Sequence, residues 1–252
     1  MTLFVLVGED DYGILNTDDG MIKIGSHRAG IPANSVVKAG DEISVKGRKY
    51  MVSDLSPCFF EHVSEKGFQT IKIKDASYMI SMSSIRSGSM VLESGCGTGS
   101  LSVSILWHIL PDGILTSVDM SEKAIESARS NIEKFNLQYG WKPILGDIRS
   151  IEIDGKFDSV FLDLPDPWES IPGIVKLLRP SGTMITYVPN YNQLERTVIC
   201  MKKNNLVVLE SVEIEKRGIL VREGMTRPDS ASIAHTAFIT VAMKKSGFTL
   251  SL

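Results

Sequence analysis

The residues in this sequence with the clearest chemistry are acids that follow short apolar runs, together with one loop that has glycine at every second position. The acids are Glu93, Asp119, Asp147 and Asp163, and the glycines are Gly95, Gly97 and Gly99. Glycine lets a backbone approach a ligand closely or adopt positive φ, and the amides that open the next helix face whatever lies above the loop. Carboxylates nearby can accept hydrogen bonds from hydroxyl and amino groups. The pattern predicts a site for a polar ligand.

Each acid after the loop has its own predicted role. Asp119 follows the last loop glycine by about 20 residues, which suits hydrogen bonds to ribose hydroxyls; it could instead cap a helix, although Ser121 is the better N-cap. Asp147 can accept from an adenine amino group. Asp163 opens the loop D-L-P-D-P-W, in which two prolines restrict φ. It is predicted to stabilise charge at a reacting centre, and the alternative is that it only caps the loop.

Alternating strands and helices must position these groups. The predicted strands are residues 90–92, 114–120, 142–145 and 157–162, and the predicted helices are residues 100–110 and 121–135. A strand, a glycine loop and a helix form the first unit of a doubly wound α/β fold, where ligands bind at the carboxyl ends of the strands. Dinucleotide-binding loops have the spacing G-x-G-x-x-G. Here the spacing is G-x-G-x-G after Glu93, which resembles motif I of class I S-adenosylmethionine-dependent methyltransferases and disfavours a nicotinamide oxidoreductase.

Residues 1–68 have a different pattern, in which short β-prone runs at residues 3–7, 12–16, 21–24 and 42–45 are separated by turns that contain glycine and mostly aspartate. These runs predict a small all-β domain, a barrel or a sandwich, ahead of a methyltransferase domain over residues 69–252. Residues 42–52 are predicted to form a hairpin. Acids outnumber bases in this segment, which argues against non-specific binding of nucleic-acid phosphates there. Two interpretations stay open, an oligomerisation or scaffold module and a substrate-binding module.

One loop points to a particular family. Residues 162–168, LDLPDPW, resemble the corresponding loop of the tRNA (adenine-N1) methyltransferases that act on position 58, or 57 and 58, of the T-loop. Further similar stretches are QTIKIKDASYMI (69–80), YVPN (187–190) with Gln193, RP (227–228), HTAF (235–238) and a turn at residues 25–30. The resemblance covers nearly the whole chain. It implies a Rossmann-like, seven-stranded methyltransferase fold with a late antiparallel strand, predicted over residues 234–244.

The resemblance also implies a cofactor, a substrate and an assembly: S-adenosyl-L-methionine, tRNA and a homotetramer, with no metal. The predicted cofactor-binding residues are Glu93, Gly95, Cys96, Gly97, Thr98, Gly99, Ser100, Asp119, Met120, Lys123, Gly146, Asp147 and Asp163. The predicted catalytic residues are Asp163 and Tyr187, and the predicted substrate-binding residues are Tyr78, Trp168, Arg227 and His235. A packing or structural role stays open for Tyr187, Tyr78 and His235, and Trp168 is more readily a rim or core anchor than a stacking platform.

The chemistry of adenine N1 suits a lone carboxylate. N1 carries a lone pair, so methyl transfer needs no strong general base. Methylation makes the base cationic, and a carboxylate beside it interacts more strongly with the transition state than with the ground state. N1 lies on the Watson–Crick edge, so the base must be extruded from the folded tRNA. The basic residues predicted to contact phosphates are Lys202, Lys203, Lys216, Arg217, Arg222 and Arg227, with a solvated face as the alternative for each.

Composition narrows the class of protein. No run of 18 or more apolar residues occurs, so we expect no membrane span, and the acidic N-terminus does not resemble a signal peptide. Three scattered cysteines favour a reducing, cytoplasmic compartment. A net charge of −3 gives no global basic character. Two further hypotheses remain: a non-catalytic tRNA-binding partner subunit, and a class I methyltransferase with a protein or small-molecule substrate.

Overall fold

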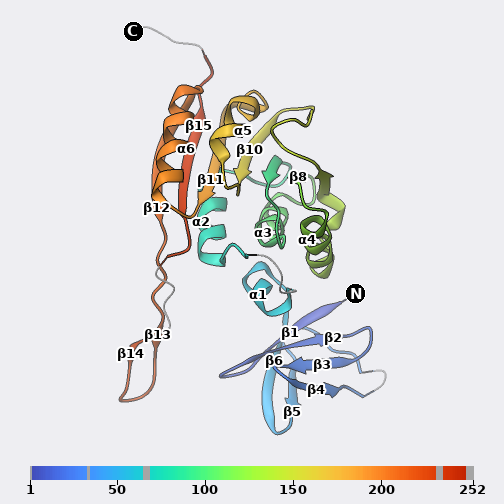
Figure 1. Cartoon of the computed structure of the whole chain (residues 1–252). Coiled ribbons are helices and arrows are strands. Elements are labelled where there is room, and N and C mark those ends of the chain that lie inside the picture. The colour runs from blue at the N-terminus through green and yellow to red at the C-terminus, as the bar shows by residue number, and fades with distance from the viewer. Residues whose placement is uncertain (1, 33–34, 65–68, 231–234, 248–252) are drawn as a thin grey trace.

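The computed structural model describes residues 2–32, 35–64, 69–230 and 235–247. An N-terminal antiparallel sheet is followed by an α/β domain (Figure 1). A short 3₁₀ turn, Pro57–Phe59, and helix α1 (Phe60–Val63) connect the two. The predicted boundary between residues 68 and 69 stays a prediction, because residues 65–68 lie outside the described part of the chain.

The N-terminal domain is one six-stranded antiparallel sheet in the order β4-β3-β2-β1-β6-β5. Its strands are β1 (Leu3–Val7), β2 (Tyr12–Asn16), β3 (Met21–Ile24), β4 (His27–Gly30), β5 (Glu42–Val45) and β6 (Arg48–Asp54). Among the described residues its edges, β4 and β5, do not pair with each other, so strand pairing does not close this single sheet into a complete barrel. One face carries an apolar core that includes Leu6, Leu15 and Ile22. The other face meets helix α1, where the Tyr12 and His62 rings are in contact, rather than a second sheet.

The C-terminal domain has the predicted seven-stranded sheet, in the order β12-β15-β11-β10-β7-β8-β9. Its strands are β7 (Met90–Ser94), β8 (Ile114–Asp119), β9 (Trp141–Leu145), β10 (Phe157–Leu162), β11 (Leu178–Val188), β12 (Leu206–Glu213) and β15 (Phe238–Lys244). The strands from β11 to β9 run parallel, while β15 is antiparallel to β11 and β12. The carboxyl ends of the parallel strands therefore meet at one edge, and the four acids gather there.

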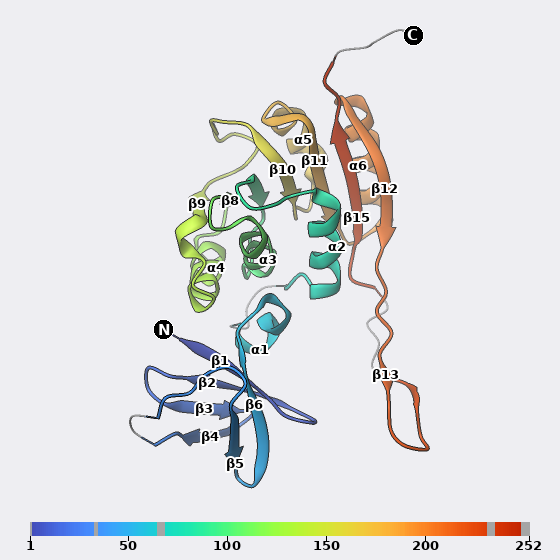
Figure 2. The same cartoon turned by 180° about the vertical axis from the view of Figure 1, so that it is seen from behind.

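Helices cover both faces of this sheet (Figures 1 and 2). They are α2 (Ile73–Ser83), α3 (Ser100–Ile109), α4 (Glu122–Lys134), α5 (Pro167–Ile174) and α6 (Tyr191–Lys203). Helices α2, α3 and α4 share an apolar core with Val91 and Phe161, while α5 and α6 share the opposite core with Leu92 and Leu162. Successive strand residues point to opposite faces. The central strands are thus buried on both sides, which holds their ends in place.

Three local predictions differ from the structure, and one hairpin was not predicted. Only Gly25 and Ser26 of the predicted turn at 25–30 form a turn, because strand β4 follows at once and pairs with β3. Lys202 and Lys203 are predicted to follow a helix over residues 191–201, but they lie in the last turn of this helix, α6, which ends at Lys203. The last strand begins at Phe238 instead of residue 234, which lies outside the described residues. The basic segment after β12 also forms a hairpin, β13 (Ile219–Leu220) with β14 (Arg227–Pro228), which projects beyond the sheet (Figure 1).

Candidate active site

A pocket of about 300 Å³ opens at the carboxyl ends of β7, β8, β9 and β10. Doubly wound sheets bind their ligands at this edge. Its lining includes Gly95, Asp119, Met120, Gly146, Asp147, Arg149, Asp163 and Asp166. The structure thus brings six of the predicted cofactor-binding residues together around one pocket. Arg149 and Asp166 were not among the predicted residues.

Two positions of the loop require glycine for steric reasons. Gly95 has a φ of +87°, and a Cβ there would lie 2.1 Å from the carbonyl oxygen of Asp163. Gly99 has a φ of +78°, and its Cβ would lie 3.0 Å from Cα of Ala128 on α4. The Asp163 amide also donates to Ser94 O at 2.9 Å. The loops after β7 and β10 are therefore in direct backbone contact, which brings Asp163 against the glycine loop.

The side chains of the loop point inward instead of into the pocket. Cys96 is buried, and burial raises the pKa of its thiol. The Thr98 hydroxyl lies 3.4 Å from that of Thr70, and the Ser100 hydroxyl donates to Ile71 O at 2.8 Å. Lys123 is exposed on α4 and does not line the pocket. Any contact of the loop with a ligand would therefore come from its backbone.

Glu93 lies beneath the glycine loop and is 1% exposed. Its Oε2 accepts hydrogen bonds from the hydroxyls of Ser102 and Ser117, each at 2.6 Å. Trp141 Nε1 donates to the Ser117 hydroxyl at 2.9 Å. Glu93 Oε1 is buried and has no hydrogen-bond partner in the described part of the chain. Burial raises the pKa of Glu93 to about 7, and the charges of Asp163 and Asp119 add to this.

Asp119 connects the end of β8 to the glycine loop. Its Oδ2 accepts from the amides of Cys96 at 2.9 Å and Gly97 at 3.4 Å. Its Oδ1 accepts from the amide of Ser121 at 2.9 Å. Ser121 is the N-cap of α4, as predicted, and its hydroxyl accepts from the amide of Ala124. Asp119 therefore orders the loop while its carboxylate lines the pocket.

Asp147 is held by Arg149, two residues further along the chain. The Arg149 Nε and Nη2 atoms donate to the two carboxylate oxygens of Asp147 at 2.8 to 3.0 Å. The guanidinium also donates to Asp166 at 3.1 Å. Hydrogen bonding to Arg149 lowers the pKa of Asp147. Arg149 thus links the loop after β9 to the loop that carries Asp163, a contact that the spacing of residues 147 and 149 alone does not reveal.

Asp163 has the opposite environment. Its partly buried carboxylate lines the pocket, and no donor from the described residues lies within hydrogen-bond distance of it. Burial raises the pKa of Asp163 to about 7, and the charge of Asp119 adds to this. A carboxylate held without donors interacts strongly with a cation or a hydrogen-bond donor that enters the pocket.

Three stretches that resemble the tRNA methyltransferases meet at the neighbouring strand end. The Tyr187 hydroxyl donates to Asp75 Oδ2 at 3.2 Å, and the Thr236 hydroxyl donates to the same oxygen at 2.9 Å. Lys74 Nζ pairs with Asp75 Oδ1 at 2.7 Å. Asp75 is 0% exposed. Burial, together with the charge of Asp75, raises the pKa of Tyr187. Tyr187 does not line the pocket, so the observed contacts hold α2 against β11.

The predicted substrate-binding residues lie outside the pocket. The Tyr78 hydroxyl donates to Glu210 on β12, and burial raises its pKa to about 12. His235 contacts Glu213 and Pro189 O, and its bond to Glu213 raises its pKa. Trp168 lies beneath the Arg196 guanidinium, and Arg227 lies on β14, so neither residue is at the pocket. Their roles toward a substrate stay predictions.

Residues 50–237 match the family described as the tRNA methyltransferase complex GCD14 subunit. The chain belongs to this family. The part that matches the GCD14 family contains the glycine loop, the four acids and the Asp75 network. In the described part of the chain, no three His, Cys, Asp or Glu side chains are grouped to hold a metal ion. No helix there has the length and apolar character for a membrane crossing.

Individual relatives agree with this assignment. The tRNA (adenine(57)-N(1)/adenine(58)-N(1))-methyltransferase TrmI of Methanocaldococcus jannaschii is 28% identical over 236 residues, which cover 82% of this chain and 83% of the relative. A putative methyltransferase from Thermoplasma acidophilum is 34% identical over 98% of both chains, with a TM-score of 0.59. A SAM-dependent O-methyltransferase from Thermotoga maritima has a TM-score of 0.84 at 21% identity, covering 99% of this chain and 95% of its own. The last similarity shows the methyltransferase fold.

Proposed function

We propose that this chain transfers a methyl group from S-adenosyl-L-methionine to N1 of an adenine in the T-loop of tRNA, at position 58 or at both 57 and 58. The observation that carries the proposal is the carboxylate of Asp163, which lines the pocket without a donor from the described residues. Membership of the GCD14 family supports methyl transfer to tRNA. The name of the Methanocaldococcus jannaschii relative supports both positions.

The pocket suits the proposed cofactor. When bound, S-adenosyl-L-methionine supplies an activated methyl group on a positively charged sulfur. Glu93 Oε1, which has no hydrogen-bond partner among the described residues, and the carboxylate of Asp163 favour a positive charge nearby. Gly95 leaves open the space that a side chain would take from the backbone of Asp163, so Asp163 can approach the glycine loop. In this proposal Asp119 accepts from ribose hydroxyls, and Asp147, oriented by Arg149, accepts from the adenine amino group.

Asp163 would stabilise the charge that develops on the substrate base. As N1 is methylated, the adenine becomes cationic and its amino group becomes a stronger donor. The carboxylate therefore gains more in the transition state than in the ground state. The prolines of the loop after β10 restrict its motion, and the contact between Asp163 and Gly95 sets its position. Positioning of this kind supplies much of the rate in an in-line displacement.

The target base must leave its stack to reach the pocket, which costs a few kcal/mol of stacking. Phosphate contacts can offset this cost and orient the RNA. Lys202 and Lys203 are exposed at the end of α6, and Lys216, Arg217, Arg222 and Arg227 are exposed in and near the hairpin of β13 and β14. These six residues are the proposed contacts on the methyltransferase domain.

The proposal includes a homotetramer in the cytoplasm. Strand β12 is an edge strand, and Val207 and Leu209 on it are 44% and 49% exposed. Ile219, Val221 and Met225 in the hairpin are also exposed. Apolar edge strands and exposed apolar patches are typical of surfaces that a second chain covers. The tRNA substrate and three free cysteines support a cytoplasmic location. Light scattering of the purified protein would measure the assembly.

The decisive experiment is incubation of the purified chain with unmodified tRNA and labelled S-adenosyl-L-methionine, followed by digestion and nucleoside analysis. We expect 1-methyladenosine, and transcripts with the adenine at 57 or 58 replaced would assign the position. A protein that binds the cofactor but forms no 1-methyladenosine would overturn the proposed substrate. Labelled protein or small molecules in a cell extract, with no labelled tRNA, would favour the other class of methyltransferase.

A further inference from the structure

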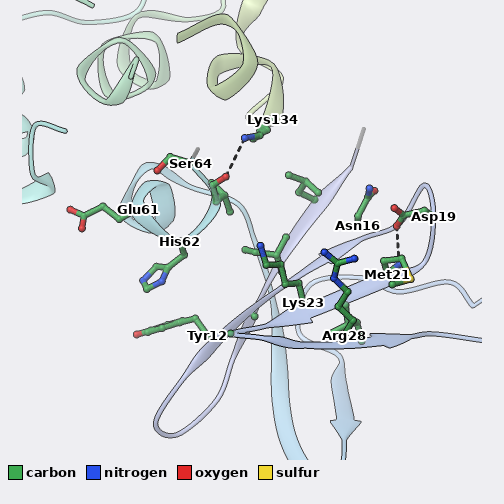
Figure 3. Close-up of a pocket in the computed structure, with 16 residues that line it drawn as sticks. Tyr12, Asn16, Asp19, Met21, Lys23, Arg28, Glu61, His62, Ser64 and Lys134 are labelled. Carbon is green, nitrogen blue, oxygen red and sulfur yellow. Dashed lines mark hydrogen bonds between the residues drawn. The ribbon is translucent and has the colours of Figure 1, made fainter. Parts of the chain in front are cut away.

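A second and larger cavity, about 910 Å³, lies between the N-terminal sheet, helix α1 and the end of α4 (Figure 3). We refer to it as the interdomain cleft. Its floor is the face of β2, β3 and β4 that carries Tyr12, Lys23 and Arg28, and its other walls come from residues around His62 and from Lys134. This cavity is separate from the pocket at the strand ends, and the proposed reaction gives it no role.

Two cations in the interdomain cleft face each other across neighbouring strands. Lys23 on β3 is directly opposite Arg28 on β4, and both side chains are exposed. Figure 3 shows both rising from the sheet into the cleft. No carboxylate of the described residues pairs with either. Like charges placed directly opposite in a sheet are destabilising, and an anion bound between them would remove this cost.

Other cations of the same sheet are paired. Arg48 lies 3.5 Å from Asp11, and Lys49 lies 2.7 Å from Glu42. The hollow that contains Arg48 and Lys49 is also lined by four acids, Glu9, Asp10, Asp11 and Glu42. These four acids lie around a hollow that is separate from the interdomain cleft. On the cleft side, the N-terminal domain presents Lys23 and Arg28 without a paired carboxylate from the described residues, although the domain is acidic as a whole.

The acids that do line the cleft are engaged elsewhere. Glu61 pairs with Lys72 at 3.0 Å, and Asp19 accepts from the amide of Met21 at 2.9 Å in the turn before β3. Lys134, on the opposite wall, donates to Val63 O at 3.2 Å and so fixes α4 against the segment after α1. The lining therefore contains three cations, Lys23, Arg28 and Lys134, against two acids.

An aromatic pair lies beside these cations. The rings of Tyr12 and His62 have centroids 4.4 Å apart with an angle of 36° between their planes, and Phe59 lies 6.0 Å from Tyr12. Tyr12 is 44% exposed. Exposed rings next to a positively charged groove are the combination by which proteins bind unpaired nucleotides, with phosphates on the cations and bases on the rings.

We infer that the interdomain cleft is an RNA-binding site, in which Lys23 and Arg28 contact phosphates and the Tyr12–His62 pair stacks on an unpaired base. The inference rests on the proposed function for the identity of the RNA, the substrate tRNA. The site contacts a part of the tRNA other than the target adenine. It supplies phosphate contacts on the N-terminal domain, whose overall negative charge otherwise repels phosphates.

The test compares two double variants that remove the same charge from the same domain: Lys23→Ala with Arg28→Ala, and the control Arg48→Ala with Lys49→Ala. For the cleft variant we expect tRNA binding about tenfold weaker, and a slope of log Kd against log salt concentration smaller by about 1.5. We expect KM for tRNA to rise similarly, with kcat and cofactor affinity unchanged. The control should behave as the unmodified protein.

A second pair of variants tests the aromatic rings. Tyr12→Leu should weaken tRNA binding about tenfold through lost stacking, while Tyr12→Phe keeps the ring and should bind normally. Equal tRNA affinity in the cleft variant and its control would overturn the inference. A change in oligomeric state with unchanged tRNA affinity would do so as well, and would assign the cleft to a second copy of the chain. Neither result touches the proposed function, which fails only if the unmodified protein forms no 1-methyladenosine.

Discussion

Asp147 and Asp163 line the same pocket from neighbouring loops, yet their surroundings are opposite. Asp147 receives hydrogen bonds from Arg149 on both oxygens, and its pKa is lowered. Asp163 is partly buried without a donor from the described residues, and its pKa is raised to about 7. A carboxylate held by arginine is fixed in place and charged over a wide pH range. A carboxylate without hydrogen-bond partners can instead interact with a cation or a donor that enters the pocket.

The pocket therefore has two ends that are suited to different tasks. The end at Asp147 and Arg149 is suited to holding a ligand in one orientation. The end at Asp163, above the buried Glu93, is suited to stabilising positive charge. Changes at the first end should therefore affect affinity, and changes at the second should affect the rate of methyl transfer. Four predictions test this division.

The largest effect is expected from Asp163→Ala. Removal of a group that acts mainly in the transition state costs about 10²–10³ in kcat, and we expect cofactor affinity to change much less. Steady-state methylation of tRNA and titration of the cofactor measure the two quantities. Asp154→Ala, which removes an exposed acid outside the pocket, is the control. Equal losses of rate and cofactor affinity would contradict the division.

Gly95→Ala displaces Asp163 without removing it. The new Cβ would lie 2.1 Å from the Asp163 carbonyl oxygen, so the loop after β10 must move. A misplacement of about 1 Å can cost 10²-fold in rate. Gly40→Ala is a matched control, because Gly40 has a similar φ of +91° and open space around its Cβ. We expect both variants to lose thermal stability from the left-handed backbone, and only Gly95→Ala to lose activity.

The pH dependence should follow Asp163. Because its pKa is about 7 and the charged form is the active one, kcat/KM should fall about tenfold per pH unit below this value and level off above it. The profile should lose this slope in Asp163→Asn and keep it in Glu93→Gln. Since the folded chain holds this proton more tightly than the unfolded chain, stability should also fall as pH rises from about 4 to about 7. The reverse pattern in the two variants would assign the titration to Glu93.

The smallest effect is expected from Arg149→Ala. A lost charge-assisted hydrogen bond is worth about 1.5 kcal/mol or more, so cofactor Kd should rise about tenfold while kcat at saturating cofactor stays nearly constant. Arg179→Ala is the control, since Arg179 pairs with Asp158 at 2.6 Å outside the pocket. An effect on kcat as large as that of Asp163→Ala would show that the two ends act as one unit.

Local patterns of apolar and turn residues predicted the bounds of several strands. Four short strands of the N-terminal domain (β1, β2, β3 and β5) and the strand Phe157–Leu162 have their predicted bounds, because apolar runs and turn residues are local features. Strand β4 was missed because His27–Gly30 contains one apolar side chain and two basic ones. It is a strand because it pairs with β3. The pairing with β3, and not the composition of these four residues, therefore makes this segment a strand.

The candidate site was predicted in outline. The order of the four acids and the spacing of the glycines placed them at one sheet edge, since parallel strands end together. Tyr187 is predicted to be catalytic, with core packing as the alternative, and in the structure its hydroxyl donates to Asp75. Asp75 precedes it by 112 residues. Nothing in the neighbourhood of Tyr187 in the chain reveals that partner.

By itself, the sequence of this protein determined which strands, loops and acids exist, because periodicity, glycine spacing and turn chemistry act over a few residues. Only the tertiary structure decided which charges are paired. Arg149 reaches Asp166 across the pocket. Among the residues that the structure describes, Asp163 has no donor and Lys23 and Arg28 stand opposite each other without an acid. The energy of a charge depends on burial and on neighbours brought together by folding, and these are the quantities that set the chemistry of both sites.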